Sequence, residues 1–167
     1  MADFMYNRGM LAGGGLVLRA CCGRSGVVAG DLKREGDGAT PKARMRLVRV
    51  FYRPDRFAAR PKASVPMVPL SSQDGWCDDP AHPDYNRLVR LPFEAGHEVL
   101  WREDGRYDLI GVLDWNLGPI TPGRGSAIFF HIAPPGYAPT EGCIGVSRED
   151  ALAALAAGMD GINVVGE

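Results

Sequence analysis

Short runs of alternating apolar and polar residues, separated by glycine and proline, extend along most of the chain and favour strands over helices. Residues 44–49 read Arg-Met-Arg-Leu-Val-Arg, the alternation of a half-buried strand with some slippage at its end. The 22 glycines and 13 prolines divide the sequence into short segments, so a mainly β fold is predicted. Strands are expected at Leu16–Cys22, Ala43–Tyr52, Glu98–Trp101, Tyr107–Trp115, Ser126–Ile132 and Ile162–Val165.

One helix is indicated near the C-terminus. Ser147 and Asp150 form an S-x-x-D capping pattern before Ala151–Leu155, and Gly158 is placed to end the helix. The sequence contains no internal repeat, no low-complexity tract and no linker long enough to separate two units. Residues 1–167 are therefore predicted to form a single domain.

Charge and hydrophobic content restrict the classes of partner. The chain has 167 residues, 46% of them hydrophobic, which is enough to bury one globular core. The formal net charge is −1, from 19 basic and 20 acidic residues, so no general attraction to nucleic acid or a membrane surface is expected. Arginines and aromatic residues interleave between Lys42 and Lys62, but no nucleic-acid partner is predicted because the whole chain is not basic.

Neither a membrane span nor an export signal is predicted. No apolar run approaches the roughly 18 residues that indicate a span. Met10–Leu18 is apolar, but it is short and glycine-rich, and it lacks the basic region and cleavage site of a convincing signal peptide.

The cysteines and histidines give no framework for disulfides or metal. Cys21 and Cys22 are adjacent, Cys77 lies far from them, and no C-x-x-C pair occurs. The three histidines have no zinc-binding spacing, so no metal site is expected. Cys143 alone lies in a chemical motif, and the other three cysteines are expected to be packing residues.

The segment from His131 to Cys143 carries the most specific chemistry. Cys143 follows Gly142, and a thiol after glycine can occupy a tight turn whose backbone N–H groups point at a reacting carbonyl. His131 lies at the end of a predicted apolar strand, where it could take the thiol proton. The pair indicates acyl transfer, although buried cysteines are commonly inert and a lone histidine is usually a packing residue.

The surrounding residues resemble a known family. Residues 140–146, Thr-Glu-Gly-Cys-Ile-Gly-Val, with His131 upstream and Asp150 downstream, resemble the signature of the L,D-transpeptidases of the bacterial cell wall, the YkuD-type catalytic domain. That signature is Ser/Thr-His-Gly-Cys, an aliphatic residue, then Asn or Arg. Residues 38–47 resemble the family's TPxGxF stretch, and Leu152 to Val165 resembles its closing helix, glycine and strand. The resemblance extends from about Gly30 to Val165.

The chain departs from the family pattern at two positions near the cysteine. Glu141 replaces the usual second histidine, and Gly145 replaces the usual Asn or Arg. The connection from His131 to Cys143 is also shorter than in many members. We interpret Glu141 as a substrate-side or structural group, because a carboxylate close to the thiol would disfavour the thiolate.

The resemblance implies a two-sheet β-sandwich with one or two short helices and a cysteine acyltransferase that needs no cofactor. His131, its ring oriented by a main-chain carbonyl such as that of Ile132, would act as general base for the nucleophile Cys143. Backbone N–H groups of Cys143, Gly142 and Glu141 would hold the oxyanion. The acyl donor would be a peptidoglycan stem peptide, and a diaminopimelate amine would resolve the thioester to a 3→3 or 1→3 cross-link.

Substrate-binding residues are expected on the segments around the cysteine. Thr140, Glu141 and Tyr137 flank the nucleophile. Arg34 and Lys33 belong to a polar loop, residues 33–38, that leads into a strand at Thr40–Pro41; either of them could meet an acidic peptide, or the loop could simply connect two strands. Trp76, Tyr85 and several carboxylates, including Asp78, lie in the irregular stretch from Pro61 to Pro92. They could recognise the ammonium end of a diamino acid, although Trp76 could equally cover the core.

Other functions remain open from sequence. Water in place of the amine would make the protein an L,D-carboxypeptidase or endopeptidase, and a buried, inert Cys143 would suit a non-catalytic wall-binding module. The family implies the periplasm or cell envelope, while the lack of a recognisable export signal leaves a cytoplasmic location possible. The oligomeric state is not predicted.

Overall fold

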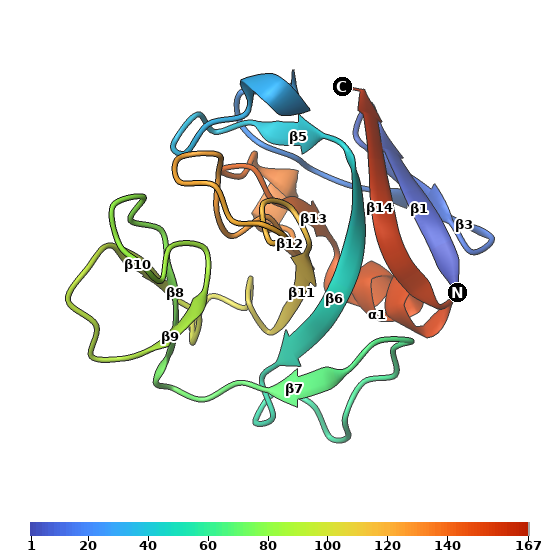
Figure 1. Ribbon diagram of the computed structural model, residues 1–167. Helices are drawn as coiled ribbons and strands as arrows, with labels where there is room; N and C mark the ends of the chain where they lie inside the picture. The colour runs from blue at the N-terminus through green and yellow to red at the C-terminus, as the bar shows by residue number, and fades with distance from the viewer. Residues whose placement is uncertain (167) are drawn as a thin grey trace.

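A nine-stranded sheet forms the framework of the protein. Most of its strands are labelled in Figure 1. The computed structural model describes residues 1–166. The strands of this sheet are β1 (Ala2–Asn7), β2 (Met10–Gly13), β3 (Leu16–Arg19), β6 (Arg44–Tyr52), β7 (Met67–Pro69), β11 (Leu109–Leu113), β12 (Phe129–Ile132), β13 (Ile144–Val146) and β14 (Met159–Gly166). Their order is β13-β12-β11-β6-β14-β1-β2-β3, with β7 paired to β6.

The long strand β6 joins two halves of the sheet. Its first residues pair with β14, and residues from Leu47 onward pair with β11. Just beyond β3, Cys21 exchanges two backbone hydrogen bonds with Gly145 of β13, at N···O distances of 2.8 and 3.0 Å. Because this contact brings the two ends of the strand order together, the sheet curls around a shared core. The predicted mainly β fold is confirmed and is consistent with a β-sandwich.

The core lies inside this curled sheet, and the helix α1 (Arg148–Ala156) packs against it. The Ser147 hydroxyl accepts the N–H of Asp150 at 3.1 Å, so the predicted cap is present. The helix buries Ala151 and Leu155, and Gly158 follows it with a φ of +87°. The buried apolar residues around the helix include Phe4, Leu11, Met45, Phe130, Ile144 and Ile162.

A small lobe projects from one side of the large sheet, at the left of Figure 1. Its strands are β8 (Asp74–Cys77), β9 (Leu88–Arg90) and β10 (His97–Val99), in the order β10-β8-β9. Trp76 joins the lobe to the large sheet, since its ring meets Phe129 edge-on at 5.1 Å and its Nε1–H donates to Asn86 at 2.9 Å. Much of the stretch predicted to be irregular is therefore ordered as short strands, which carry too few residues for a periodic pattern.

Apart from the strand expected at Thr40–Pro41, which is β5, the remaining elements were not apparent from the sequence. A two-stranded sheet joins β4 (Val27–Ala29) to β5 (Thr40–Lys42), and 3-10 helices lie at Gly30–Leu32 and Pro135–Tyr137. Strands β1, β2 and β13 were also not predicted. No helix within residues 1–166 combines the length and apolar character needed to cross a membrane.

Candidate active site

A cleft of about 370 Å³ lies between the lobe and the ends of β12 and β13. Both Cys143 and His131 line this cleft, and so do Thr140 and Glu141. The parallel pairing of β12 with β13 sets His131 beside Gly145, which places the histidine next to the strand that follows the cysteine. The cleft is completed by Lys33, Glu35, Gly36, Asp78, Glu98, Arg102, Arg106, Tyr107, Ser126, Ala127, Ile128 and Pro139.

The turn before Cys143 requires glycine and is fixed by hydroxyl groups. Gly142 has a φ of +140°, and a Cβ at this position would lie 2.8 Å from the carbonyl oxygen of Ala39. The Thr140 hydroxyl donates to the carbonyl of Cys143 at 2.7 Å, and the Thr40 hydroxyl donates to the carbonyl of Gly142 at 2.8 Å. The stretch around Thr40 therefore holds the turn that presents the thiol.

The Cys143 thiol is buried and hydrogen-bonded to the backbone. Its side chain donates to the carbonyl of Ala127 at 3.2 Å and accepts the N–H of Phe129 at 3.4 Å. Burial raises the pKa of this thiol, and the nearby Glu98 carboxylate raises it further. The resting group is therefore a neutral thiol.

His131 is held as a neutral imidazole with one nitrogen available. Its Nδ1 lies 2.7 Å from the carbonyl of Ile132, which assigns the proton to Nδ1 and leaves Nε2 as an acceptor. The hydrogen bond to Ile132 is the one expected from the sequence. Burial lowers the pKa of His131 to about 4, and the ring packs edge-on against Tyr107 at 5.4 Å. A neutral imidazole in the same cleft as a neutral thiol can serve as a proton acceptor.

The expected role of the Gly142 N–H needs correction. This group donates to the Thr140 hydroxyl at 3.1 Å, so it is already engaged within the turn. Gly142 instead contributes its backbone conformation, which the contact with Ala39 requires. The N–H of Cys143 is the better candidate for contact with a developing oxyanion.

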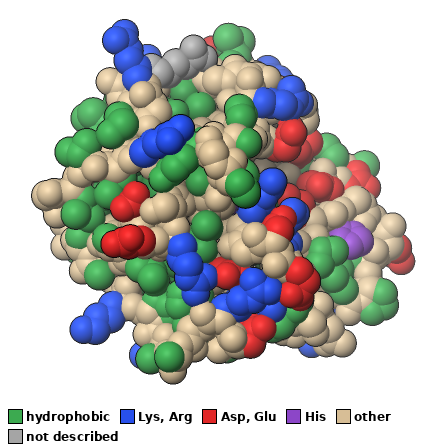
Figure 2. Space-filling view, turned by 180° about the vertical axis from the view of Figure 1, so that it is seen from behind, with side chains coloured by type: hydrophobic (Ala, Val, Ile, Leu, Met, Phe, Trp, Pro, Cys, Tyr) green, Lys and Arg blue, Asp and Glu red, His purple; other side chains and the backbone are tan. Residues whose placement is uncertain are grey.

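The walls of the cleft carry charges of both signs. Glu35, Asp78 and Glu98 lie among its acidic lining residues, while Arg102 and Arg106 are basic. Burial raises the pKa of Asp78, with a further contribution from Glu35. Figure 2 likewise shows acidic and basic side chains intermixed on one face of the molecule rather than a large patch of one sign. Such a cleft suits a ligand that has both ammonium and carboxylate groups.

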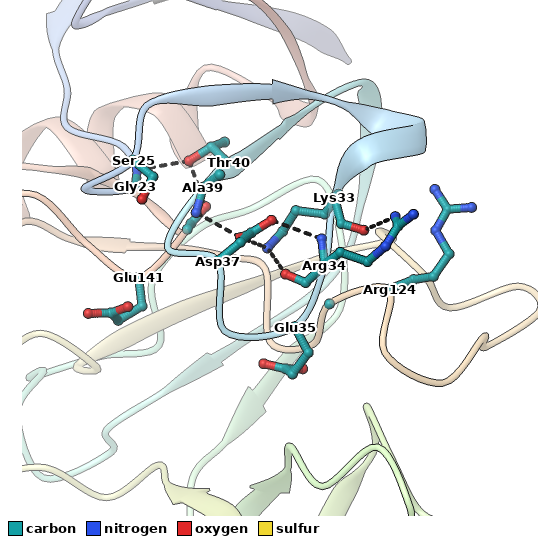
Figure 3. A network of polar contacts seen from close by, with 12 residues as sticks. Gly23, Ser25, Lys33, Arg34, Glu35, Asp37, Ala39, Thr40, Arg124 and Glu141 are labelled. Atoms are coloured by element: carbon teal, nitrogen blue, oxygen red, sulfur yellow. Dashed lines mark hydrogen bonds and ion pairs between the residues drawn. The ribbon is translucent and has the colours of Figure 1, made fainter.

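Arg34 does not line the cleft, contrary to the expectation from sequence. Its guanidinium donates to the carbonyls of Asp31 and Lys33, at 2.8 and 2.7 Å. Figure 3 shows its side chain extending away from Glu35 and Glu141. The neighbouring Lys33 does reach the cleft.

Lys33 is neutralised within its own loop. Its ammonium donates to Asp37 at 2.6 Å and to the carbonyl of Arg34 at 2.9 Å, as Figure 3 shows. Burial opposes ionisation of Asp37, but the hydrogen bonds from Lys33 and from two backbone N–H groups lower its pKa below the ordinary value. The ion pair between Lys33 and Asp37 stabilises the loop, and it offsets the positive charge that Lys33 could offer a ligand.

Three aromatic residues expected to bind substrate also lie outside the cleft lining. Trp76 is buried in the lobe, the structural role considered from sequence. The Arg19 guanidinium lies over the ring of Tyr137, with its Cζ atom 4.2 Å from the ring centroid. Tyr85 is buried and its hydroxyl donates to Glu35 at 2.6 Å, so it positions a cleft carboxylate rather than meeting the cleft directly.

The two departures from the family signature have physical explanations. The Glu141 carboxylate pairs with Arg24 at 3.0 Å, and its side chain is 79% exposed at the rim of the cleft. A Cβ on Gly145 would lie 3.0 Å from both Cys21 Sγ and Ala133 Cα. Cys21 and Ala133 therefore leave little room for a side chain at position 145.

Several residues of the cleft were missed from sequence. Glu35 and Glu98 come from separate segments, and no motif spacing connects them to Cys143. Asp78, by contrast, belongs to the loop whose carboxylates were considered for binding an ammonium group. Tyr107 was assigned to a strand but not to the site. Within residues 1–166, no three histidine, cysteine, aspartate or glutamate side chains lie together in a way that could hold a metal ion.

A known protein family matches most of the chain. Residues 6–164 match the family model YkuD, described as the L,D-transpeptidase catalytic domain. The chain therefore belongs to the L,D-transpeptidase catalytic domain family. Searches of curated proteins and of solved structures give no match.

Proposed function

We propose that this protein is a cysteine acyltransferase that cross-links peptidoglycan stem peptides, an L,D-transpeptidase. The observation that carries the proposal is the presence of Cys143 and His131 in one cleft, with the imidazole Nδ1 bound to Ile132 and Nε2 left as an acceptor. Membership of the family supports the same reaction class.

The first step is acylation of Cys143. Because the pKa of the thiol is raised and that of His131 is lowered to about 4, the pair rests in its neutral form. His131 Nε2 takes the proton as the sulfur attacks the amide carbonyl of the donor stem. The backbone N–H of Cys143 stabilises the oxyanion, and the imidazolium returns its proton to the departing amine.

The second step resolves the thioester. The side-chain amine of diaminopimelate in a second stem attacks the acyl carbon, the thiol is released, and a 3→3 or 1→3 cross-link results. The mixed charges of Glu98, Asp78 and Arg106 suit substrates with both ammonium and carboxylate groups. Peptidoglycan as substrate places the working protein in the cell envelope.

Acylation and product masses test this proposal. The purified protein is incubated with a carbapenem and, separately, with muropeptides, and the masses of protein and products are measured. We expect a covalent adduct on Cys143 and a cross-linked dimer. Cys143→Ala should remove both, whereas Cys22→Ala, a change at a half-buried cysteine outside the cleft lining, should retain them.

The alternative outcomes are distinct. Adducts confined to Cys21, Cys22 or Cys77 would contradict the assignment of the nucleophile. Shortened stems without dimers would identify an L,D-carboxypeptidase, and cleaved dimers an endopeptidase. The absence of any adduct on folded protein would favour a wall-binding module.

A further inference from the structure

Glu98 of β10, in the lobe, lines the same cleft as Cys143 and His131. The Tyr107 hydroxyl lies 3.2 and 3.5 Å from the two oxygens of the Glu98 carboxylate. The Tyr107 ring is packed edge-on against His131 at 5.4 Å and against Phe129 at 6.0 Å. Glu98 is thus held by the same aromatic residue that borders the histidine.

The electrostatic surroundings of Glu98 set it apart from the other cleft carboxylates. Burial raises the pKa of Glu98 to about 7, and Asp78 and Glu35 act in the same direction. The Tyr107 hydroxyl and the Arg102 guanidinium oppose this rise. At neutral pH the carboxylate and the carboxylic acid are therefore both populated, as a group that exchanges protons during turnover requires.

Two of the other acidic side chains have closer partners, and the third, Asp78, lacks the link through Tyr107 to His131 that Glu98 has. Glu35 accepts hydrogen bonds from Tyr85 and from Ser126, each at 2.6 Å, so its carboxylate is already engaged. Glu141 pairs with Arg24 at the exposed rim. Glu98 has the Tyr107 hydroxyl as its hydrogen-bond donor, and both of its oxygens accept from that one group.

The transfer step needs a second proton acceptor. A diaminopimelate amine arrives as an ammonium ion and must lose two protons to become an amide nitrogen. His131 can return one of these protons to the leaving thiolate, but an ammonium ion cannot attack until another proton has already left. A partly buried carboxylate facing the acyl group would both attract the ammonium and accept this proton.

We propose that Glu98 is a catalytic residue of the transfer step, where it binds the incoming ammonium and removes its first proton. This inference rests on the proposed transpeptidase function. The amine lone pair then attacks the thioester carbon, the C–N bond forms and the C–S bond breaks. The second amine proton passes through His131 to the Cys143 thiolate, and Glu98 releases its proton to solvent.

The two half-reactions separate this role from the function itself. Acylation is measured with a carbapenem, and transfer is measured as dimer yield from muropeptides. Glu98→Gln should acylate at least as fast as wild type, because the charge that raises the Cys143 pKa is gone. Its transfer rate should fall by about 100-fold, the scale of general-base catalysis. Glu94→Gln, an exposed change in the same lobe, should match wild type in both steps.

A small amine supplies a second readout. Hydroxylamine is uncharged at neutral pH, so its attack on the thioester needs no ammonium site and no prior deprotonation. Glu98→Gln should keep the wild-type rate with hydroxylamine while losing the rate with the diaminopimelate amine. Equal losses with both acceptors, or equal transfer in the Glu98 and Glu94 variants, would overturn the proposal.

Tyr107→Phe tests the same role if Glu98→Gln does not fold. This change keeps the ring against His131 but removes the hydroxyl that lowers the Glu98 pKa. The pH at which transfer reaches half its maximum should therefore move upward, while the acylation profile does not follow it. An unmoved transfer profile would contradict the role of Glu98. Failure of wild type to acylate at all would instead count against the proposed function.

Discussion

Acidification should destabilise the native protein through His131, and the size of the effect follows from the burial of this residue. The side chain is 3% exposed, and its pKa is lowered from 6.5 to about 4, chiefly by burial. Arg106 and Arg102 lower it further, while the Ile132 carbonyl and Asp104 oppose the change. The unfolded chain therefore binds a proton at His131 in a pH range where the folded chain does not.

The sign and magnitude are set by proton linkage. The stabilising contribution of the neutral imidazole is fully present above pH 6.5 and is lost as the pH falls toward 4. The lowering from 6.5 to about 4 corresponds to about 3 kcal/mol in total. Roughly 2 kcal/mol of this should be lost between pH 7 and pH 5.

Urea unfolding of wild type and His131→Gln at pH 7, 6 and 5 measures the effect. Glutamine does not titrate, so the loss between pH 7 and pH 5 should be about 2 kcal/mol smaller in the variant than in wild type. The substitution itself changes the free energy of unfolding by an amount that does not depend on pH. Comparing how that free energy varies with pH in the two proteins removes this constant change. Coincident slopes would show that His131 is not held neutral in the folded state, and the neutral-pair mechanism would fail with it.

Glu98 changes the stability in the opposite direction as the pH falls, so its contribution must be separated from that of His131 in the same experiment. Its pKa is raised to about 7, so its contribution to stability is present below pH 4.5 and is lost as the pH rises through 7. The two groups partly cancel in wild type. Glu98→Gln should therefore steepen acid destabilisation, although by less than the pKa suggests, because the carboxylate is partly exposed.

Two further substitutions test the turn and the rim. Gly142→Ala should destabilise the fold by on the order of 1–3 kcal/mol, seen in urea unfolding, because of its positive φ and the close Ala39 carbonyl; wild-type stability would refute the conformational argument. Glu141→Gln should change acylation and transfer by less than about fivefold, because the carboxylate is exposed and paired with Arg24. A selective, much larger loss of transfer would instead support the substrate-side role considered for Glu141 from sequence.

Local patterns were sufficient for the elements that carry their own signals. The alternation around residues 44–49 corresponds to the observed strand β6, and the Ser147 cap begins the observed helix. Strands β4, β7, β8, β9 and β13 were missed because three or four residues show no clear periodicity, and the six-residue strand β1 was missed as well. The glycine before Cys143 was noticed for its chemistry, but its contact with Ala39 comes from a distant segment and was not visible in the sequence.

The sequence by itself determined the mainly β character, the capped helix and the resemblance that pointed to Cys143 and His131. These follow from alternation, capping and a short motif, all of which depend on residues close together in the chain. Tertiary structure alone decided that Arg34 lies outside the cleft and that Glu98 faces it. It also decided the protonation of the reacting pair, because a pKa responds to burial and to charges brought close by folding, whatever their separation in sequence.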